Sequence, residues 1–573
     1  MGGLLEKLSH FGVLFALIVI IGISGWIGVV AQRAVSRGSF LKGFFLGNRG
    51  LGVWAMALTA TVQSGGTFMG VPSLIYKNGF IVALWIGSYM LVPLTGFAVV
   101  GKRLSHLSRR TNAVTVPDLF RNRFESPMLG LVTSIVLLFF LSFMLMAQFK
   151  GGAIVMKLAW PSNAEMALTD GSEPAPTVKA EGGKPEAEKK VDYQYLIGLA
   201  VFTTVVVGYT LFGGFLASVW TDMFQSVLMA IGVMILLALS LKAAGGLEQA
   251  THTAVAKIDA EAAAKKLENP SADEKPGVAY VTGPGLSEVP FLPLGTAISF
   301  FFVWIWGGIS SPASVVRVMS AKSTATLRRS IVVLSFYNLM IYLPLIAVCI
   351  CARAILPTLT NTDEVVPKMS IELTREIFGG SFVSGLILAA PFGAIMATVS
   401  CYLVVIASGI VHDIYQRFIN PNASEKQIRN LTHAAMLVIG VVALAANIKP
   451  PNFLQSLVVF CTSGQTGGFL IPLLMACYWR RATKEGVIAA MASGALTVLA
   501  LNVSGWVQYG YFAFRPYQLL GIEPVVWGIG VSAVVGIIVT LLTPPPEEEL
   551  VRRMFDVETP TSKGATAEPA TAQ

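Results

Sequence analysis

The stretch TATVQSGGTFMG, residues 59–70, places hydroxyl and amide oxygens inside an otherwise apolar segment. Its adjacent glycines, Gly65 and Gly66, lower the cost of unwinding a helix. Unwinding frees backbone carbonyl oxygens, which suit a hard cation such as Na⁺ together with the side chains of Gln63 and Thr67. Close packing of neighbouring helices against small residues is the other interpretation of this glycine pair. The stretch alone leaves both open.

A second apolar segment carries the same kind of interruption. Residues 301–314 read FFVWIWGGISSPAS, in which Gly307 and Gly308 precede two serines and a proline. The two interrupted segments are the second and seventh apolar segments of the chain, five apart. An inverted repeat of five plus five helices produces this spacing, and an odd repeat gives the halves opposite orientations in a membrane. We therefore expect helix breaks near both glycine pairs.

Two charged side chains also fall in apolar segments. Asp222 lies in YTLFGGFLASVWTDMFQ, residues 209–225, and a carboxylate inside the membrane is by default a functional hypothesis. The alternative is an acid at the membrane interface, stabilised near the start of a helix. Lys150 lies in MAQFKGG, where it either meets a substrate carboxylate or extends towards the outer interface, and we favour the latter.

The composition identifies the class of protein. Of 573 residues, 54% are hydrophobic and only 13% are charged, whereas soluble domains carry about 25% charged residues. A membrane-spanning helix needs about 20 mostly apolar residues. Thirteen segments meet this requirement, and they predict an all-α integral membrane protein with about thirteen transmembrane helices: 11–32, 51–75, 79–101, 127–158, 193–212, 214–242, 292–319, 328–355, 378–410, 430–448, 453–478, 485–505 and 524–543.

The basic residues predict the orientation. Lysine and arginine cluster in the loops after the first, third, seventh, ninth and eleventh segments, and the alternate short loops are nearly free of them. Because basic loops stay in the cytoplasm, we expect the N-terminus outside and the C-terminal tail inside a cell (plasma or inner) membrane. This bias accounts for the net charge of +9. We therefore expect the lipid bilayer, and no nucleic acid, as a partner.

The remaining features argue against an enzyme. Residues 161–192 and 243–291 are polar insertions expected outside the membrane, the second with a short helix around residues 254–267. A phosphate-binding loop of the GxxxxGK[ST] type is absent from the sequence. The five histidines show no metal-ligand spacing, and we expect His106 and His412 to be solvated loop residues. The five cysteines fall in or beside apolar segments and are expected to be structural.

Three stretches resemble the sodium/solute symporter family: FLGNRGLGVWAMALTATVQSGGTFMGVP, FGGFLASVWTDMFQ and AAPFGAIMATVSCYLVVIASGIVHDIY. Within it, RRTNAVTVPDLFRNRF and ILAAPFGAIMAT are most similar to the sodium/pantothenate symporter branch. The resemblance implies the leucine-transporter-type 5+5 inverted repeat with one extra helix before it and two after. The implied organisation is an N-terminal end with the extra helix (1–50), a first repeat (51–242), a polar insertion (243–291), a second repeat (292–478), two additional helices (479–543) and a cytoplasmic tail (544–573).

The resemblance also implies a sodium site. Its backbone carbonyls match Ala60 and Gln63 on the first broken helix, and Ala394 on the ninth segment. Its side chains match Ala397 and Thr398, which share one helix face with residue 394. The family usually has a hydroxyl at position 397, so the alanine puts Na⁺ affinity, or Na⁺ dependence, in doubt. Asp222 matches an acid on the cytoplasmic exit path of the ion.

A solute site is expected between the broken helices, the fourth segment and the eleventh. Helix packing is an equally good interpretation of each single residue there. The function that the resemblance implies is Na⁺-coupled symport of a small organic solute, anionic and similar to pantothenate or a monocarboxylate. A proton-coupled or uncoupled carrier and a non-transporting membrane sensor are the alternatives. The candidate solute residues are Gln63, Thr67, Gln148, Trp304, Trp306, Ser310, Thr462 and Gln465.

Overall fold

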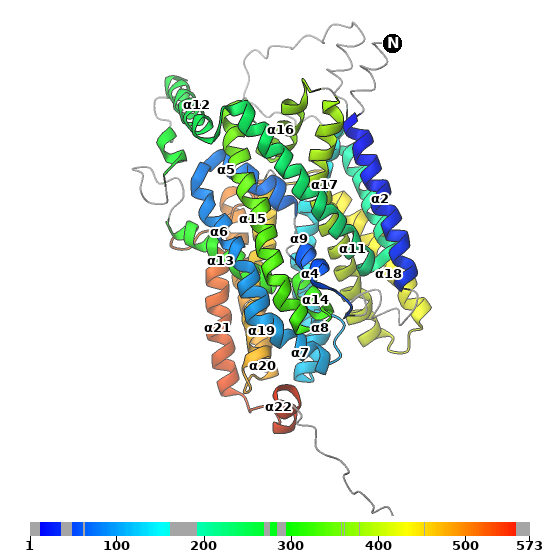
Figure 1. The fold of residues 1–573 in the computed structure, drawn as a ribbon. Coiled ribbons are helices and arrows are strands. Elements are labelled where there is room, and N and C mark those ends of the chain that lie inside the picture. The colour runs from blue at the N-terminus through cyan, green and yellow to red at the C-terminus, as the bar shows by residue number, and fades with distance from the viewer. Residues whose placement is uncertain are drawn as a thin grey trace, which may run out of the picture.

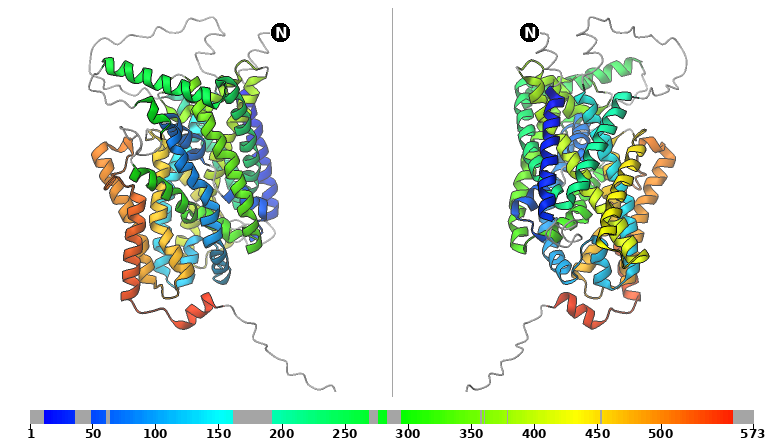
Figure 2. Two further views of the ribbon diagram at one scale, coloured as in Figure 1. Left: turned by 60° about the vertical axis from the view of Figure 1, so that its left-hand side comes forward. Right: turned by 90° about the vertical axis from the view of Figure 1, so that its right-hand side faces the viewer.

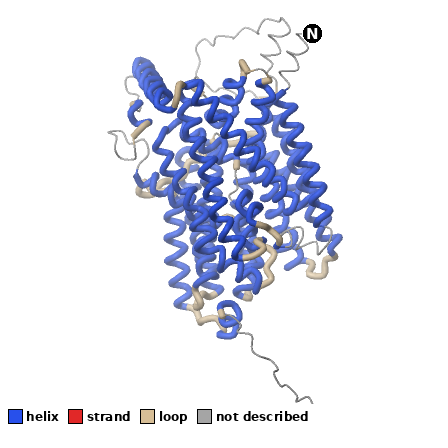
Figure 3. The backbone as a smooth tube through the Cα atoms, viewed as in Figure 1, coloured by secondary structure: helices blue, strands red, loops and turns tan. Residues whose placement is uncertain are grey.

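The computed structural model describes a bundle of long, nearly parallel helices (Figure 1). The described residues are 12–35, 49–60, 64–160, 192–268, 276–282, 294–356, 358–359, 361–377, 379–451 and 453–556. Within them every named element is a helix, and Figure 3 shows helices joined by short loops with no strand. The predicted all-α membrane architecture is confirmed.

The first half of the bundle begins after helix α2 (Gly12–Val35), which packs against α11 and α17. It contains α4 (Val53–Ala60), η2 (Gly66–Gly70), α5 (Val71–Asn78), η3 (Gly79–Val82), α6 (Ala83–Val92), η4 (Pro93–Gly101), α7 (Lys102–Arg110), α8 (Val116–Phe124), α9 (Pro127–Ala159) and α11 (Tyr193–Ala244). Local capping sets several of these starts. Ser126 accepts a hydrogen bond from the Leu129 amide, and Pro127 occupies the first turn of α9, where its missing N–H costs nothing.

The second half repeats the order of elements. It contains α13 (Leu294–Ser310), α14 (Pro312–Ser320), α15 (Thr324–Ile355), η6 (Thr362–Glu364), α16 (Val365–Thr374), α17 (Gly380–Ser408), η7 (Gly409–Ile419), α18 (Glu425–Ala446) and α19 (Leu454–Tyr478). Helices α20 (Lys484–Tyr509) and α21 (Pro524–Leu542) follow as a closely packed pair, with η8 (Tyr511–Ala513) in the loop between them. A short amphipathic helix, α22 (Glu548–Phe555), ends the described chain.

The first interruption lies where the sequence predicts it. Helix α4 ends at Ala60, and the wide turns of the π-helix η2 begin at Gly66. The second interruption is displaced from its predicted position. Helix α13 continues through Gly307 and Gly308 to Ser310, and the break falls at Ser311, before Pro312. A glycine costs a helix about 1 kcal/mol, but proline removes a backbone donor and clashes with the preceding turn, so the proline decides the position.

The two broken spans run in opposite directions. Figure 1 shows α5 above α4, whereas α14 lies below α13. Two short helices follow the same inversion: α16, between α15 and α17, lies at the upper end, and α8, between α7 and α9, lies at the lower end (Figure 1). We call α16 with η6 the outer connector and α8 the inner connector. They occupy equivalent places in the two halves.

The described residues contain eleven helices long and apolar enough to cross a membrane, or up to twelve with one bent pair. The thirteen segments expected from the sequence differ from these helices only between residues 51 and 110. There α4 is too short to qualify, and the pair Gly66–Val82 and Trp85–Arg110 is bent by 99°. Tyr193–Leu211 and Ser218–Ala244 qualify separately although both belong to α11. At 1.5 Å per residue, a straight helix of the 52 residues of α11 would be about 78 Å long. One bilayer crossing needs about 30 Å, so α11 is long enough for the two spans.

The polar insertions differ in what the structure describes. Residues 161–191 lie outside the described residues. The helix expected at 254–267 is present and longer, as α12 (Leu247–Glu268). Figure 2 shows α12 lying across one end of the bundle, and α22 lies at the opposite end (Figure 2). Arg353 on α15 pairs with Glu261 on α12 at 2.6 Å.

Candidate ion and solute site

The break in the first span is held by polar contacts from other helices. The Gly65 amide donates to Gln148 Oε1 on α9 at 2.7 Å, and Thr67 Oγ1 lies 3.2 Å from the Tyr342 hydroxyl on α15. A Cβ atom at Gly65 would lie 3.3 Å from the side chain of Ile395, so α17 packs directly against the break. Gly65 and Thr67, which follow the break, therefore contact α9, α15 and α17.

The residues matched to the sodium site are only partly described. Gln63 lies outside the described residues, and Ala60 is the last residue of α4, its side chain not described. Ala394, Ala397 and Thr398 are all buried on α17. Thr398 Oγ1 donates to the Ala394 carbonyl at 3.0 Å. Their role in binding sodium stays a prediction.

Asp222 belongs to a buried network that joins four helices. Its Oδ2 atom accepts from Arg317 on α14 at 3.0 Å and from Ser218 at 3.5 Å. Ser218 in turn lies 2.9 Å from Ser400 on α17, and Arg317 Nε donates to Thr59 on α4 at 3.2 Å. Asp222 is 2% exposed, and its place on the path of the ion stays a prediction.

The candidate solute residues do not form one cluster. Gln148 and Thr67 lie at the first break, as described above. Ser310 donates to the Trp306 carbonyl, and Gln465 donates to the Cys461 sulfur at 2.9 Å. The methyl group of Thr462 faces Gly307, where an added Cβ would lie 2.5 Å away. Trp304 belongs to the column of rings described next.

Five stacked rings lead inwards to the first break. The ring centroids are 4.5 Å apart between Phe300 and Trp85, 5.5 Å between Trp85 and Trp304, 4.7 Å between Trp304 and Tyr89, and 4.5 Å between Tyr89 and Tyr342. The rings come from α6, α13 and α15. The column ends at Tyr342, whose hydroxyl contacts Thr67. Its other end, Phe300 and Trp85, borders a cavity.

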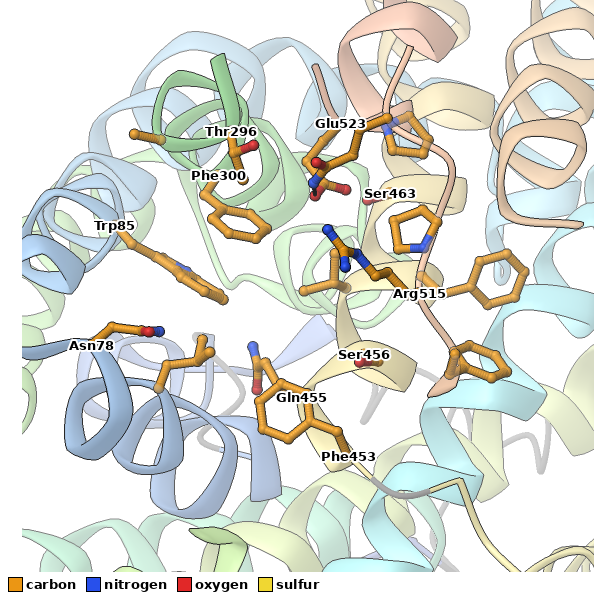
Figure 4. A pocket seen from close by; sticks show the side chains of 18 of the residues that line it. Asn78, Trp85, Thr296, Phe300, Phe453, Gln455, Ser456, Ser463, Arg515 and Glu523 are labelled. Carbon is orange, nitrogen blue, oxygen red and sulfur yellow. Dashed lines mark hydrogen bonds between the residues drawn. The ribbon is translucent and has the colours of Figure 1, made fainter. Parts of the chain in front are cut away.

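This outer cavity has a volume of about 500 Å³. It lies among the C-terminal end of α5, the N-terminal ends of α13, α19 and α21, and the loop from α20 to α21 (Figure 4). Its size is typical of sites for small molecules. The polar and charged residues that line it are Lys77, Asn78, Thr296, Gln455, Ser456, Ser463, Asn502, Arg515, Gln518 and Glu523.

Two buried amide and hydroxyl groups lack partners at this cavity. Neither polar atom of the Gln455 amide has a hydrogen-bond partner among the described residues, and the same holds for Ser463 Oγ. Both residues are 1% exposed. The Gln455 amide also reaches the first broken span, since a Cβ atom at Gly70 would lie 1.8 Å from its Oε1. Sequence reasoning chose Thr462 and Gln465 on this helix and missed Gln455 and Ser463.

The expectation for Lys150 is wrong. Its side chain does not extend to the membrane interface but is buried, 2.8 Å from Asp363 Oδ2 on the outer connector. The same carboxylate oxygen accepts from the Leu454 amide at 3.2 Å, at the start of α19. Ser73 on α5 is hydrogen-bonded to Thr362 beside it. Asp363 thus ties the outer connector to α9 and α19.

The expectation for His412 is also wrong. It is 3% exposed, and its Nε2 lies 2.9 Å from Asp118 Oδ2 on the inner connector. Arg417 donates to the other oxygen of Asp118 at 3.0 Å, and Thr115 donates to Asp413 at 2.6 Å. Burial alone would raise the pKa of Asp118, but the hydrogen bond and charge of His412, with the charge of Arg417, lower it below its usual value. The ligand atoms of Asp118, His412 and Asp413 lie within 4.8 Å of one another. Because Arg417 and His412 already occupy Asp118, we interpret the group as an anchor rather than a metal site.

The comparison with known families gives a clear result. The family model described as the sodium:solute symporter family matches residues 44–172 and 186–494. The chain belongs to this family. It is therefore a multi-pass membrane transporter of small solutes and not an enzyme, as the sequence predicts.

Relatives within the sodium:solute symporter family cover nearly the whole chain. The sodium/pantothenate symporter of Escherichia coli (strain K12) is 30% identical over 514 residues, 89% of this chain and 91% of its own. That of Haemophilus influenzae is 27% identical over 90% of this chain and 95% of its own. The sodium/proline symporter of Escherichia coli (strain K12) is 25% identical over 93% of both chains.

A solved structure supports the fold. The chain is similar to a Na⁺-coupled sialic acid symporter in a substrate-bound outward-open state, with a TM-score of 0.62 and 18% sequence identity over 94% of this chain and 99% of that chain. This likeness confirms the predicted leucine-transporter-type fold.

Proposed function

We propose that the protein couples the inward movement of Na⁺ to the uptake of a small carboxylate-bearing solute, similar to pantothenate, by alternating access. Sodium-coupled transport is the common property in the names of the relatives reported above. The two relatives named for pantothenate support the finer choice of solute. The proposal includes an orientation with the N-terminus outside, which the distribution of basic loops supports.

The observation that carries the proposal is the packing of α17 against the first break. Ile395 contacts Gly65, and Ala394, Ala397 and Thr398 lie on the same helix, next to that contact or within one turn of it. Thr398 is fully buried and supplies a hydroxyl oxygen. In our proposal this oxygen, the Ala394 carbonyl and the carbonyls of Ala60 and Gln63 coordinate Na⁺, which prefers oxygen ligands. Ala397 supplies none, so the site depends on Thr398.

Asp222 and Arg317 offer a route for ion release in this proposal. Their pair lies between α11, α14, α4 and α17, and Ser218, one turn before Asp222 on α11, contacts Ser400. Because Arg317 already neutralises Asp222, the carboxylate attracts a cation only when α14 moves away from α11. Neutralising Asp222 is therefore expected to slow release of Na⁺ to the inside.

Uptake by proteoliposomes tests the function. Vesicles containing the full chain are given an inward Na⁺ gradient, an inward proton gradient or neither, with labelled pantothenate outside. We expect accumulation above equilibrium only with the Na⁺ gradient. Accumulation driven by protons would favour the proton-coupled alternative. Equilibration under all three conditions would favour an uncoupled carrier, and no uptake of pantothenate or proline would favour a sensor.

A further inference from the structure

The outer cavity carries an excess of positive charge. Lys77, at the end of α5, and Arg515, in the loop between α20 and α21, both line it. Figure 4 shows the Arg515 side chain directed from that loop into the cavity, towards the side of Phe300 and Glu523. Lys77 lies over the ring of Phe453, 5.0 Å from its centroid. An arginine at a cavity mouth both attracts anions and binds a carboxylate through two parallel hydrogen bonds.

One acidic residue, Glu523, offsets part of this charge and lies within reach of the charge of Arg515. Glu523 is 3% exposed, and its carboxyl group accepts a hydrogen bond from Gln518 rather than from a cation. Its burial raises the pKa of Glu523 to about 7. Lys77, Arg515 and Glu523 are the charged residues of the described chain that line the cavity. The sum of their charges therefore stays positive.

The inner side of the cavity offers hydrogen bonds without charge. Gln455 and Ser463 present donors and acceptors that have no partner among the described residues. Buried polar groups without partners are costly, so a ligand that forms hydrogen bonds with them gains affinity. Phe300 and Trp85 add apolar ring surface on the opposite wall (Figure 4). The Gln455 amide also contacts the first broken span through Gly70.

We infer that the outer cavity is a recruiting site for a monocarboxylate whose other end carries hydroxyl or amide groups. Arg515 binds the carboxylate, and Gln455 and Ser463 bind the polar end next to the first broken span. The loop from α20 to α21, outside the two repeats, thus selects the charge of the solute before the solute reaches the break. The inference rests on the proposed transport function, because the cavity then lies on the path of the solute.

The test compares one charged and one neutral probe. Binding of labelled pantothenate, and of the alcohol in which its carboxylate is replaced by CH₂OH, is measured with the purified full chain. Initial uptake of both is measured in cells that express it. We expect Arg515→Gln to raise the Kd and KM for pantothenate tenfold or more, with the maximal rate within twofold. The values for the alcohol stay unchanged, and Arg515→Lys restores part of the affinity for pantothenate.

Controls separate this site from other effects. Arg552→Gln, on the exposed helix α22, removes an arginine far from the cavity and is expected to change neither probe. Ser463→Ala is expected to weaken both probes, because both carry the hydroxyl and amide end. Equal losses for the two probes in Arg515→Gln, unchanged values for pantothenate, or no pantothenate binding by the wild type would overturn the inference. Failure of Na⁺ to drive uptake would contradict the proposed function instead, and leaves the binding comparison interpretable.

Discussion

The outer and inner connectors occupy equivalent places in the two halves, and each is anchored by one buried aspartate. Asp363 joins the outer connector to α9, the helix that follows the inner connector. Asp118 joins the inner connector to η7 at the end of α17, the helix that follows the outer connector. Each connector is therefore fixed to the opposite half. Because each connector is fixed to a helix of the opposite half, we expect α9 and α17 to form one frame, against which the broken spans move.

The two anchors differ in how their charge is balanced. Asp363 pairs with the ammonium of Lys150, both side chains are almost fully buried, and the charge of Asp363 also acts on Lys77. Asp118 faces a histidine and an arginine, and a second carboxylate, Asp413, lies beside the histidine. The Arg417 side chain is 36% exposed and reaches water. The Asp363–Lys150 pair is thus the more deeply buried of the two, so a charge left there without its partner costs more.

Breaking the outer anchor is expected to have the largest effect on stability. Asp363→Asn removes the carboxylate that faces the buried Lys150, and the loss of one partner of such a pair costs about 3–5 kcal/mol. Thermal unfolding of the purified protein measures this. The double variant Lys150→Met/Asp363→Leu is expected to recover part of the lost stability. The control variant Glu372→Gln, at an exposed position on α16, is expected to lose no stability. Equal stability of Asp363→Asn and the wild type would contradict the proposed anchor.

Breaking the inner anchor is expected to cost less. In Asp118→Asn the asparagine still accepts from His412 or Arg417, Asp413 remains beside the histidine, and Arg417 turns to water. We expect a loss of about 1–3 kcal/mol, typical of a buried polar group that loses its charged partner. The same thermal measurement, run in the same detergent, compares the two variants directly. A loss at Asp118 as large as that at Asp363 would show that the two anchors are equivalent.

The acids of the two ends are expected to respond differently to pH. The pKa of Glu523 is raised to about 7, so this group is mostly neutral at pH 6 and mostly ionised at pH 8. Ionisation adds a negative charge to the cavity that holds Lys77 and Arg515, and KM for an anionic solute should rise a few fold as the outer pH rises through 7. Asp118, with its pKa lowered, stays ionised throughout. In Glu523→Gln the rise of KM with pH should disappear. A pH profile identical to that of the wild type would show that Glu523 is not the group responsible.

The sequence predicts the helices well because long apolar segments and the charged loops between them are local features. It also places the first break, since Gly65 and Gly66 coincide with polar residues. The second break is misplaced by three residues because the glycine pair is compatible with a helix, whereas Pro312 ends it. The proline stands in the sequence, and giving it more weight than the glycines would have corrected the prediction.

The anchors could not be read from the sequence. Lys150 and Asp363 are 213 residues apart, and His412 and Asp118 are 294 apart, so only the folded chain shows that they pair. The sequence around a lysine in an apolar helix, or around a histidine after one, does not show whether the side chain has such a partner. The cavity was missed for a different reason. Gln455 and Ser463 lie on α19 together with the predicted Thr462 and Gln465, and choosing among the polar residues of one helix requires the neighbouring helices.

The central claim is that Na⁺ is bound between the first broken span and α17, and the most direct test is the Na⁺ dependence of uptake in Thr398→Ala. Thr398 supplies the site's only side-chain oxygen from α17, and losing about 1.4 kcal/mol of binding corresponds to a tenfold weaker affinity. We therefore expect the Na⁺ concentration for half-maximal pantothenate uptake to rise about tenfold or more, with Ala397→Ser lowering it. An unchanged Na⁺ concentration for half-maximal uptake in Thr398→Ala would contradict the account.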